Sequence, residues 1–331
     1  PRGIVYQSVG AKRMASRFNG TVGIAVRDGE PLTLPSLQSY LPGLSSAETV
    51  DYAETQGIPG LRAAWREEMG RKNRGLDMET VSLPAVIPGL TAGISVAADL
   101  FVNPNDPVFL PDLSWDNYQL IFGTKREAAI HRYPLFNPGG AGDGGAGGGG
   151  LLNIAGMVDT IRKRAPGRKA VLLLNFPNNP TGYSPTTTEA EELAEGIRAL
   201  GNEGRDILVI LDDAYFGLFY RNDIYARSLF TLLSGLHERV LAVKVDGTTK
   251  EDFTWGFRIG FITFGCKGLS SAHYGALSEK LAAITRGTFS SSSRVAQSLL
   301  LKTIGAPDYR GEKERLFTLL KERFLKVSSV T

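Results

Sequence analysis

The chain has 331 residues, of which 42% are hydrophobic and 21% charged. This length and composition are sufficient to bury a large hydrophobic core, and they predict one large α/β domain with a smaller part of the chain beside it. The 37 Lys and Arg residues against 34 Asp and Glu leave a net charge of +3, which argues against a nucleic-acid surface. The single cysteine, Cys266, excludes an internal disulfide framework and a cysteine-based zinc site.

The N-terminal stretch PRGIVYQSVGAKRM lacks the apolar centre of a signal peptide, and no stretch approaches the roughly 20 apolar residues of a membrane span. A reducing cytoplasm is therefore the expected location, with Cys266 as a buried core thiol. Because the chain begins at Pro1 instead of methionine, we expect it to be a piece of a longer protein.

Apolar runs bounded by turn residues predict strands that are buried on both faces. In chain order these runs are Ala85–Ile87, Val108–Leu110, Ala170–Phe176, Ile207–Leu211, Val240–Val245 and Ile259–Phe264. Helical segments separate them, so the expected fold is α/β, with a mostly parallel central sheet and helices on both faces.

The clearest helix is predicted in TEAEELAEGIRALGNEG, which follows the third of these runs. Leu193, Ile197 and Leu200 share one face at helical spacing. Thr188 and Glu191 fit a capping box at its start, and Gly201 fits a C-cap at its end.

The segment Gly139–Gly150 contains a formal G-x-G-x-x-G match at Gly142, Gly144 and Gly147. A dinucleotide site needs a strand before and a helix after this motif, whereas HRYPLFNP precedes it. Ordering so many glycines is entropically unfavourable, which favours a flexible surface connection.

Polar side chains follow three of the predicted strands. LLLNFPNNPTGYSP places Asn179 after the first, Asp212 and Tyr215 follow the second, and DGTTKEDFTWGFRIG carries Lys250 and Arg258 after the third. Ligands of open α/β sheets bind beyond the carboxyl ends of strands, so these side chains are expected to converge on one crevice.

In this order along the chain, the motifs resemble the class I/II aminotransferases, fold-type I enzymes that use pyridoxal 5′-phosphate (PLP). The resemblance runs from about Asn19 to Gln297. It implies an amino-acid aminotransferase of the aspartate/aromatic kind that works as a homodimer. It also implies a PLP-binding large domain at 46–290 and a small domain made of 1–45 and the start of a truncated C-terminal part, 291–331.

The resemblance assigns the Schiff base and the later proton transfer to Lys250, which stands eight residues before Arg258. Lys244 is the rival. It lies inside the apolar run VLAVKV without a matching arginine, so we interpret it as a strand-edge lysine.

Asp212 is implied as the carboxylate that keeps the pyridine nitrogen protonated, and Asp213 is expected to point to the opposite face as a structural residue. Tyr215 and Asn179 match the family's two donors to the phenolic oxygen of the ring. The polar residues that follow the predicted strand Ala170–Phe176 are therefore expected to contact a cofactor ring.

Phosphate contacts are implied for one guanidinium and for two backbone amides at a helix N-terminus, namely Arg258, Leu90 and Thr91. Gly247 occupies the position where the family usually has a phosphate-binding serine. Thr248 or Thr249 is expected to compensate.

Trp115, in LPDLSWDNY, matches the aromatic residue that stacks on the cofactor ring, with support from Asn117. Tyr52 resembles the tyrosine that reaches the phosphate of the neighbouring subunit. Gly23 resembles the glycine near the substrate carboxylate, with a β-edge glycine as the alternative. Arg286 resembles the arginine for a substrate side-chain carboxylate, with an exposed arginine after a helix as the alternative.

The family's arginine for the substrate α-carboxylate has no match, because neither Arg315 nor Arg323 lies in a suitable motif. Several PLP reactions share the residues named above, so a PLP-dependent lyase or synthase is an alternative to the aminotransferase. A PLP-binding sensor domain of a transcription regulator, which has the same fold, is another. A metal hydrolase is disfavoured and no metal site is expected, since none of the histidines has metal-ligand spacing: His131, His237 and His273.

Overall fold

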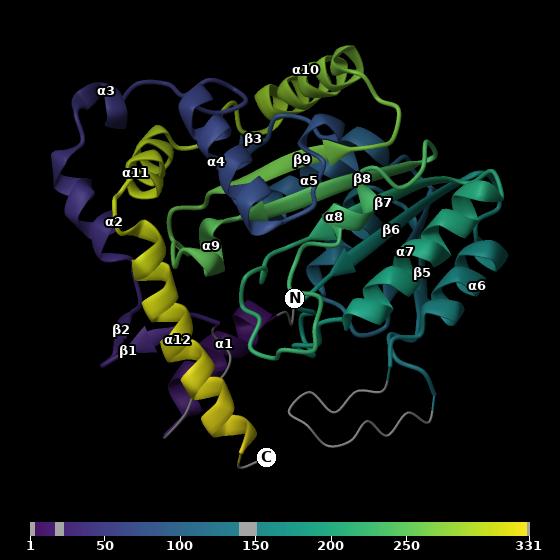
Figure 1. Cartoon of the computed structure of the whole chain (residues 1–331), viewed down its shortest axis with the longest axis horizontal. Coiled ribbons are helices and arrows are strands. Elements are labelled where there is room, and N and C mark those ends of the chain that lie inside the picture. Colours follow the sequence, from purple (N-terminus) through teal and green to yellow (C-terminus); the bar gives the residue numbers. More distant parts are fainter. Residues whose placement is uncertain (1–3, 17–22, 139–150, 330–331) are drawn as a thin grey trace.

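A computed structural model describes residues 4–16, 23–138 and 151–329 of the chain (Figure 1). The predicted flexible connection Gly139–Gly150 lies outside the described residues.

Within this part of the chain, seven strands form one sheet in the order β3-β9-β8-β7-β6-β4-β5. The strands are β3 (Ala85–Ile87), β4 (Pro107–Pro111), β5 (Ala129–Tyr133), β6 (Lys169–Asn175), β7 (Asp206–Asp212), β8 (Val240–Gly247) and β9 (Gly260–Gly265). In this sheet β9 runs antiparallel to its two neighbours, β3 and β8, and the other strands all run in the opposite direction to it. The predicted mostly parallel sheet and its six predicted strands are confirmed, and β5 was missed because AIHRY is a half-buried edge strand without an apolar run.

Helices cover both faces of the sheet, as Figure 1 shows. The helices α6 (Ile154–Arg164), α7 (Thr187–Asn202) and α8 (Phe230–Leu233) pack on one face, where they bury Leu172 and Val209. The other face packs against α5 (Leu90–Phe101), α10 (Ser271–Thr288) and a π-helical turn, Gln119–Lys125, and buries Leu173 and Ile210. Successive strand side chains therefore alternate between two cores, as the two-residue period of a strand requires.

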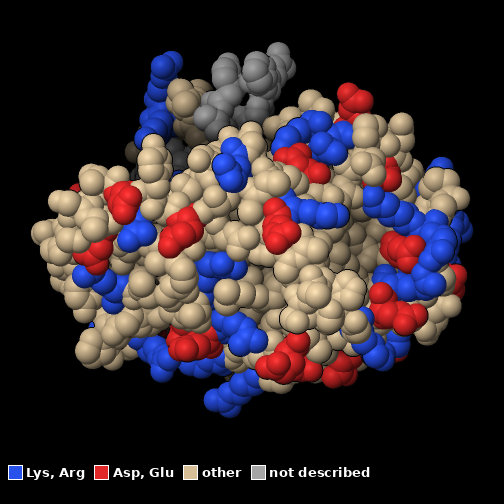
Figure 2. Space-filling model, turned by 90° about the horizontal axis from the view of Figure 1, so that it is seen from above, with Lys and Arg blue, Asp and Glu red and all other residues tan. Residues whose placement is uncertain are grey.

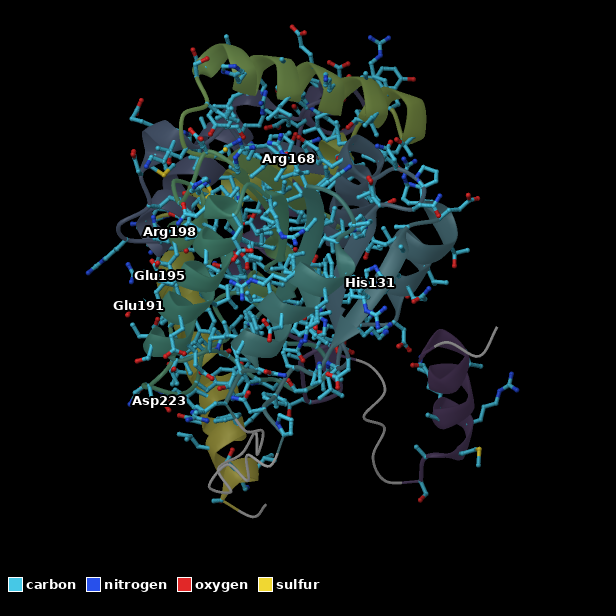
Figure 3. All side chains as sticks on the ribbon, turned by 90° about the vertical axis from the view of Figure 1, so that its right-hand side faces the viewer. His131, Arg168, Glu191, Glu195, Arg198 and Asp223 are labelled. Atoms are coloured by element: carbon cyan, nitrogen blue, oxygen red, sulfur yellow. The ribbon has the colours of Figure 1, made fainter. Side chains whose placement is uncertain are left out.

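The cap of α7 lies two residues before the predicted one. Thr186 and Glu189 form the capping box, and Glu191 is exposed on the outside of the helix (Figure 3). The prediction of Thr188 and Glu191 was wrong because three consecutive threonines, 186–188, stand at the start of the helix, each with a possible capping hydroxyl. Gly201 is also not the C-cap: the helix runs to Asn202, and the left-handed glycine is Gly204, with φ +86°.

The predicted apolar face of α7 is confirmed. Leu193, Ile197 and Leu200 are buried in the core shared with α6. Glu195 and Arg198 point outward on the opposite side (Figure 3). Burying each leucine or isoleucine contributes about 1.5–3 kcal/mol, so this face is what attaches the helix to the sheet.

The N- and C-terminal parts of the chain meet at the other end of the molecule. Leu34 and Leu37 pack with Tyr309 in one apolar cluster. Ser36 Oγ donates a hydrogen bond of 2.6 Å to the buried carboxylate of Glu312. This contact joins α2 (Pro35–Tyr40) to α12 (Tyr309–Ser328), the helix that crosses the lower left of Figure 1.

The remaining elements are short or lie around this end of the fold. They are α1 (Ile4–Met14), β1 (Val26–Arg27), β2 (Glu30–Pro31), η1 (Leu41–Gly43), α3 (Ser46–Thr49), α4 (Pro59–Lys72), η2 (Met78–Thr80), α9 (Thr248–Glu251) and α11 (Arg294–Ile304). None of the helices among the described residues is both long and apolar enough to cross a bilayer. On the face shown in Figure 2, positive and negative side chains are interspersed, in line with the near-balanced composition.

Candidate active site

Asp212 is the last residue of β7, and the residue is only 3% exposed. It accepts a hydrogen bond of 2.6 Å from the Tyr118 hydroxyl and one of 3.0 Å from the Ala214 amide. Burial raises the pKa of Asp212, while the hydrogen bond from Tyr118 and the charge of Lys250 oppose that rise. The site thus contains a buried carboxyl group whose charge depends on its donors.

Lys250 lies in α9, directly after β8. Its ammonium nitrogen is 4.7 Å from the centroid of the Tyr215 ring. Burial lowers the pKa of Lys250, as does the charge of Arg258, while Asp212 acts in the opposite direction. A lysine with a lowered pKa has more of the neutral amine that nucleophilic catalysis needs. We call Lys250, Asp212, Tyr118, Tyr215 and Arg258 the Lys250 cluster.

Lys244, the rival lysine, is fully buried, so its assignment as a strand-edge residue was wrong. It lies on β8, a central strand covered on both faces. Its charge is compensated by Asp213 and Asp246, each at 2.7 Å. Asp213 points away from Asp212, as predicted for consecutive residues at a strand end.

Arg258 and the start of α5 form a corner of the site. Gly89 precedes the helix with φ 89°, and a Cβ atom there would lie 2.5 Å from Arg258 Nη2. A Cβ on Gly260 would lie 3.2 Å from the Leu90 amide nitrogen. The guanidinium therefore lies against the turn whose helix begins with Leu90 and Thr91, where backbone N–H groups are unpaired and favour an anion.

Gly247 stands where backbone segments meet too closely for a side chain. A Cβ atom would lie 2.6 Å from the Ile259 carbonyl oxygen and 2.7 Å from the Gly260 Cα atom. Thr248 is buried and its hydroxyl accepts a hydrogen bond of 2.6 Å from Thr254. Thr249 is also buried, but its hydroxyl has no hydrogen-bond partner among the described residues. Of the two expected substitutes for the family's serine, Thr249 therefore has the available hydroxyl.

Because of these close contacts, changing Gly247 to serine is expected to damage the site, even though the family that the sequence resembles usually has serine at this position. Overpacking of this kind destabilises by about 1–3 kcal/mol, and we expect weaker PLP binding as well. Gly256→Ser, at an exposed position in the next loop with open space for a Cβ, is the matched control. Urea unfolding and PLP titration measure both effects, and tighter PLP binding by Gly247→Ser would contradict this interpretation.

Tyr118 is a site residue that the sequence analysis missed. It is 1% exposed, and its ring meets that of Trp115 edge to face, with centroids 5.5 Å apart. The sequence signal that could have indicated Tyr118 is its position three residues after Trp115, in the same segment beyond β4. Trp115 and Tyr118 thus form a wall of the site, and the Tyr118 hydroxyl reaches Asp212.

Replacing Tyr118 by phenylalanine should weaken cofactor binding because Asp212 loses a hydroxyl donor. A hydrogen bond to a charged group contributes about 1.5–3 kcal/mol, which corresponds to a PLP dissociation constant at least about tenfold higher. Tyr40→Phe, in the apolar cluster between α2 and α12, is the control for loss of a tyrosine hydroxyl. Equal affinities of Tyr118→Phe and the unmodified chain for PLP would argue against a role for this donor.

The turn after β6 positions Asn179 through its neighbours. Asn175 accepts a hydrogen bond of 2.7 Å from the Asn179 amide and donates one of 2.8 Å to the Asp212 carbonyl. Asn178 binds Leu113 and Thr181. The side-chain amide of Asn179 makes no hydrogen bond to another described residue, so it remains available for a ligand.

Three predicted residues lie apart from the Lys250 cluster. Tyr52 is 89% exposed, Gly23 is exposed with open space around its Cα, and Arg286 is exposed in the last turn of α10. Within the described residues, no hydrogen bond, ion pair or ring contact joins them to the cluster. Their predicted roles therefore stay predictions that involve other parts of an assembly.

A cavity of about 310 Å³ is lined, among others, by Phe216, by Glu251 of α9 and by Lys313 of α12. None of the predicted cofactor-binding residues lines it. The candidate active site is therefore identified by its hydrogen-bond donors and charged groups, not by this cavity.

Comparison with known proteins gives one family. Its profile, described as aminotransferase class I and II, matches residues 29–324. The chain is 25% identical to the mitochondrial aspartate aminotransferase of Schizosaccharomyces pombe, over 61% of this chain and 44% of that protein. It is 24% identical to the aspartate aminotransferase of Sulfurisphaera tokodaii, over 97% of this chain and 71% of that protein. The chain thus spans less than half of the first relative.

Comparison with solved structures gives aminotransferases with the same fold. An aminotransferase from Anaerococcus prevotii matches with a TM-score of 0.77 and 21% identity, over 98% of this chain and 75% of that one. An aromatic-amino-acid aminotransferase from Burkholderia pseudomallei, covalently bound to pyridoxal phosphate, matches with a TM-score of 0.76 and 18% identity. This match covers 98% of this chain and 77% of that one. These matches confirm the predicted fold type I, and with the profile covering most of its length this chain belongs to the class I and II aminotransferase family.

Proposed function

We infer that this chain is a PLP-dependent aminotransferase that moves an amino group from an amino acid to a 2-oxo acid. The observation that carries the proposal is the Lys250 cluster, in which a lysine of lowered pKa lies against a phenol and faces a buried carboxylate and a guanidinium. The names of the relatives, aspartate and aromatic-amino-acid aminotransferases, support the same reaction.

The residues present fit the phosphate group of PLP. Thr249 offers a buried hydroxyl without a partner among the described residues, and Arg258 offers a guanidinium at the N-terminus of α5. The amides of Leu90 and Thr91 add unpaired donors at the same helix end. Fixed donors and a positive charge are what a phosphate dianion requires.

The residues also fit the cofactor ring. Bound PLP supplies an aldehyde and an electron-withdrawing ring that stabilises negative charge on the substrate α-carbon. Asp212, supported by Tyr118, would hold a proton on the ring nitrogen. Tyr215 and Asn179 would donate to the phenolic oxygen, and Trp115 would cover one face of the ring.

Lys250 has two tasks in this proposal. Its amine would hold the cofactor aldehyde covalently, and burial, which lowers the pKa of Lys250, favours the neutral form needed for this. The same amine would accept the proton of the substrate α-carbon and return it. A 2-oxo acid would be the acceptor in the second half of the exchange.

The remaining assignments concern the assembly. Tyr52 would reach the phosphate of a second subunit in a homodimer, and its 89% exposure leaves it available for that contact. Gly23 would lie near the substrate carboxylate, and Arg286 would bind an acidic side chain. The contact of Ser36 with Glu312 supports a small domain built from 1–45 and 291–331 beside a large domain at 46–290. A cytoplasmic location is part of the same proposal.

The test is an assay of the purified chain with PLP and an amino donor, with and without a 2-oxo acid. Aspartate, glutamate and aromatic amino acids serve as donors. We expect amino transfer that requires the 2-oxo acid. Turnover without that acceptor would indicate a lyase or synthase, and PLP binding without any turnover would favour a sensor domain; either result overturns the proposal.

A further inference from the structure

Three charged side chains are buried together beside the Lys250 cluster. Lys244 Nζ lies 2.7 Å from a carboxylate oxygen of Asp213 and 2.7 Å from one of Asp246. Ser228 Oγ donates to the same oxygen of Asp213 at 2.6 Å, and Trp65 Nε1 donates to Asp246 at 3.2 Å. The lysine side chain is 1% exposed. We call Asp213, Lys244 and Asp246 the buried triad.

The triad lies on the opposite face of the sheet from Asp212. On β7, Leu208 and Ile210 share a core with Trp115 and Tyr118, and Asp212 continues that alternation. Lys244 is two residues from Ala242, which belongs to the core on the other face. The triad and the proposed cofactor site therefore occupy the two sides of the same pair of strand ends.

The triad connects these strand ends directly. Asp213 follows β7, and its amide donates a hydrogen bond of 2.9 Å to the Val245 carbonyl of β8. Asp246 lies at the end of β8, and the chain continues from it through Gly247 into α9 and Lys250. Lys244 thus bridges the strand that ends in Asp212 to the strand that leads to Lys250.

The charges of the triad act on Asp212. Two carboxylates and one ammonium leave one net negative charge, and Asp213 is the immediate neighbour of the buried Asp212. A like charge nearby favours the neutral form of a carboxyl group, and the low dielectric of the interior strengthens this effect. With Lys244 removed, the charge of Asp213 would act on Asp212 without compensation.

We propose that Lys244 is a positioning residue that compensates Asp213 and so keeps Asp212 ionised. It also holds the ends of β7 and β8 together. The proposal depends on the proposed function only for the role that it gives Asp212 at the cofactor ring.

Other charged and titratable groups also lie near the triad and near Asp212. On the triad side, α4 presents Lys72, which lies 4.2 Å from the Trp65 ring and is paired with Glu251. On the Asp212 side, Tyr118, Tyr215 and Lys250 face the carboxylate. Substitutions within the triad leave all of these in place.

The experiment is a pH titration of aspartate carboxyl carbons by NMR on the full chain, first without and then with added PLP. Asp212→Asn assigns the Asp212 signal. The titration midpoint of Asp212 should rise by about one pH unit or more in Lys244→Met, because a neighbouring charge shifts a buried carboxyl by this amount. Asp213→Asn should lower it, and the double variant Lys244→Met/Asp213→Asn should return it close to its original value.

An unchanged Asp212 midpoint in Lys244→Met, or a double variant that stays as high as Lys244→Met, would overturn the proposal. A purely structural role for Lys244 predicts no rescue by the second substitution. Should Lys244→Met fail to fold, Asp213→Asn and the double variant decide the question, since Lys244 keeps Asp246 as partner in the former. Because the first titration needs no cofactor, failure to bind PLP tests the proposed function separately.

Discussion

Changing Lys250 to alanine is expected to abolish covalent attachment of PLP and to lower amino transfer by roughly 10⁴-fold or more, because under the proposed function the variant would lose both the amine that attaches the cofactor and the group that moves the α-proton. Mass spectrometry after borohydride reduction should find the cofactor on Lys250 in the unmodified chain and on no residue of the variant. The remaining phosphate and ring contacts should still bind PLP reversibly.

The control for this experiment is Lys280→Ala, which removes an exposed lysine of α10. It should behave like the unmodified chain. Attachment of PLP to Lys244 instead of Lys250 would contradict the assignment. The structure argues against that outcome because Lys244 is fully buried and held by two carboxylates.

The order of the motifs allowed much of the site to be predicted from the sequence. Asp212 ends one buried strand and Lys250 follows the next, and parallel strands bring their carboxyl ends to one edge of the sheet. The structure does bring these residues together with Tyr215 and Arg258. Local chain order was sufficient here because each residue is fixed by the strand that precedes it.

What the sequence did not reveal depends on contacts between distant segments. The hydrogen bond from Tyr118 to Asp212 joins residues 94 positions apart. The environment of Lys244 is similarly non-local: one carboxylate partner is contributed by the neighbouring strand end, and only the sheet order places it there. An isolated lysine in an apolar run therefore looks like an edge residue until its partners are known.

Lys313→Met is expected to give the largest loss of stability, about 3–5 kcal/mol at neutral pH, because it leaves the buried Asp252 without its ion-pair partner and Glu251 with Lys72 alone. Lys313, on α12, lies 2.8 Å from Glu251 and 2.9 Å from Asp252, which follow Lys250 in the chain. Tyr309 also donates to Asp252, at 2.6 Å. These contacts attach α12 to the turn that carries Lys250, so the position of Lys250 should also be disturbed in the variant.

The loss of stability in Lys313→Met should depend on pH in a defined direction. Burial alone would raise the pKa of Glu251, but Lys313 and Lys72 outweigh burial and lower it to about 2. A carboxyl group with a lowered pKa stabilises the fold above its ordinary pKa of about 4.3, and this contribution disappears as the pH falls toward 2. The gap between variant and unmodified chain should therefore be widest near neutral pH and narrow below about pH 4.3.

Urea unfolding at several pH values measures this gap, with Arg315→Met as the matched control on the same helix. Arg315 is paired with Asp308 at 2.7 Å, but both side chains are more than 60% exposed, at 62% and 64%. Water and salt screen such a pair, so its removal should change stability little at any pH. If Lys313→Met were no less stable than Arg315→Met, or if its deficit grew toward acid, the buried cluster would not be what holds α12 against the turn of Lys250.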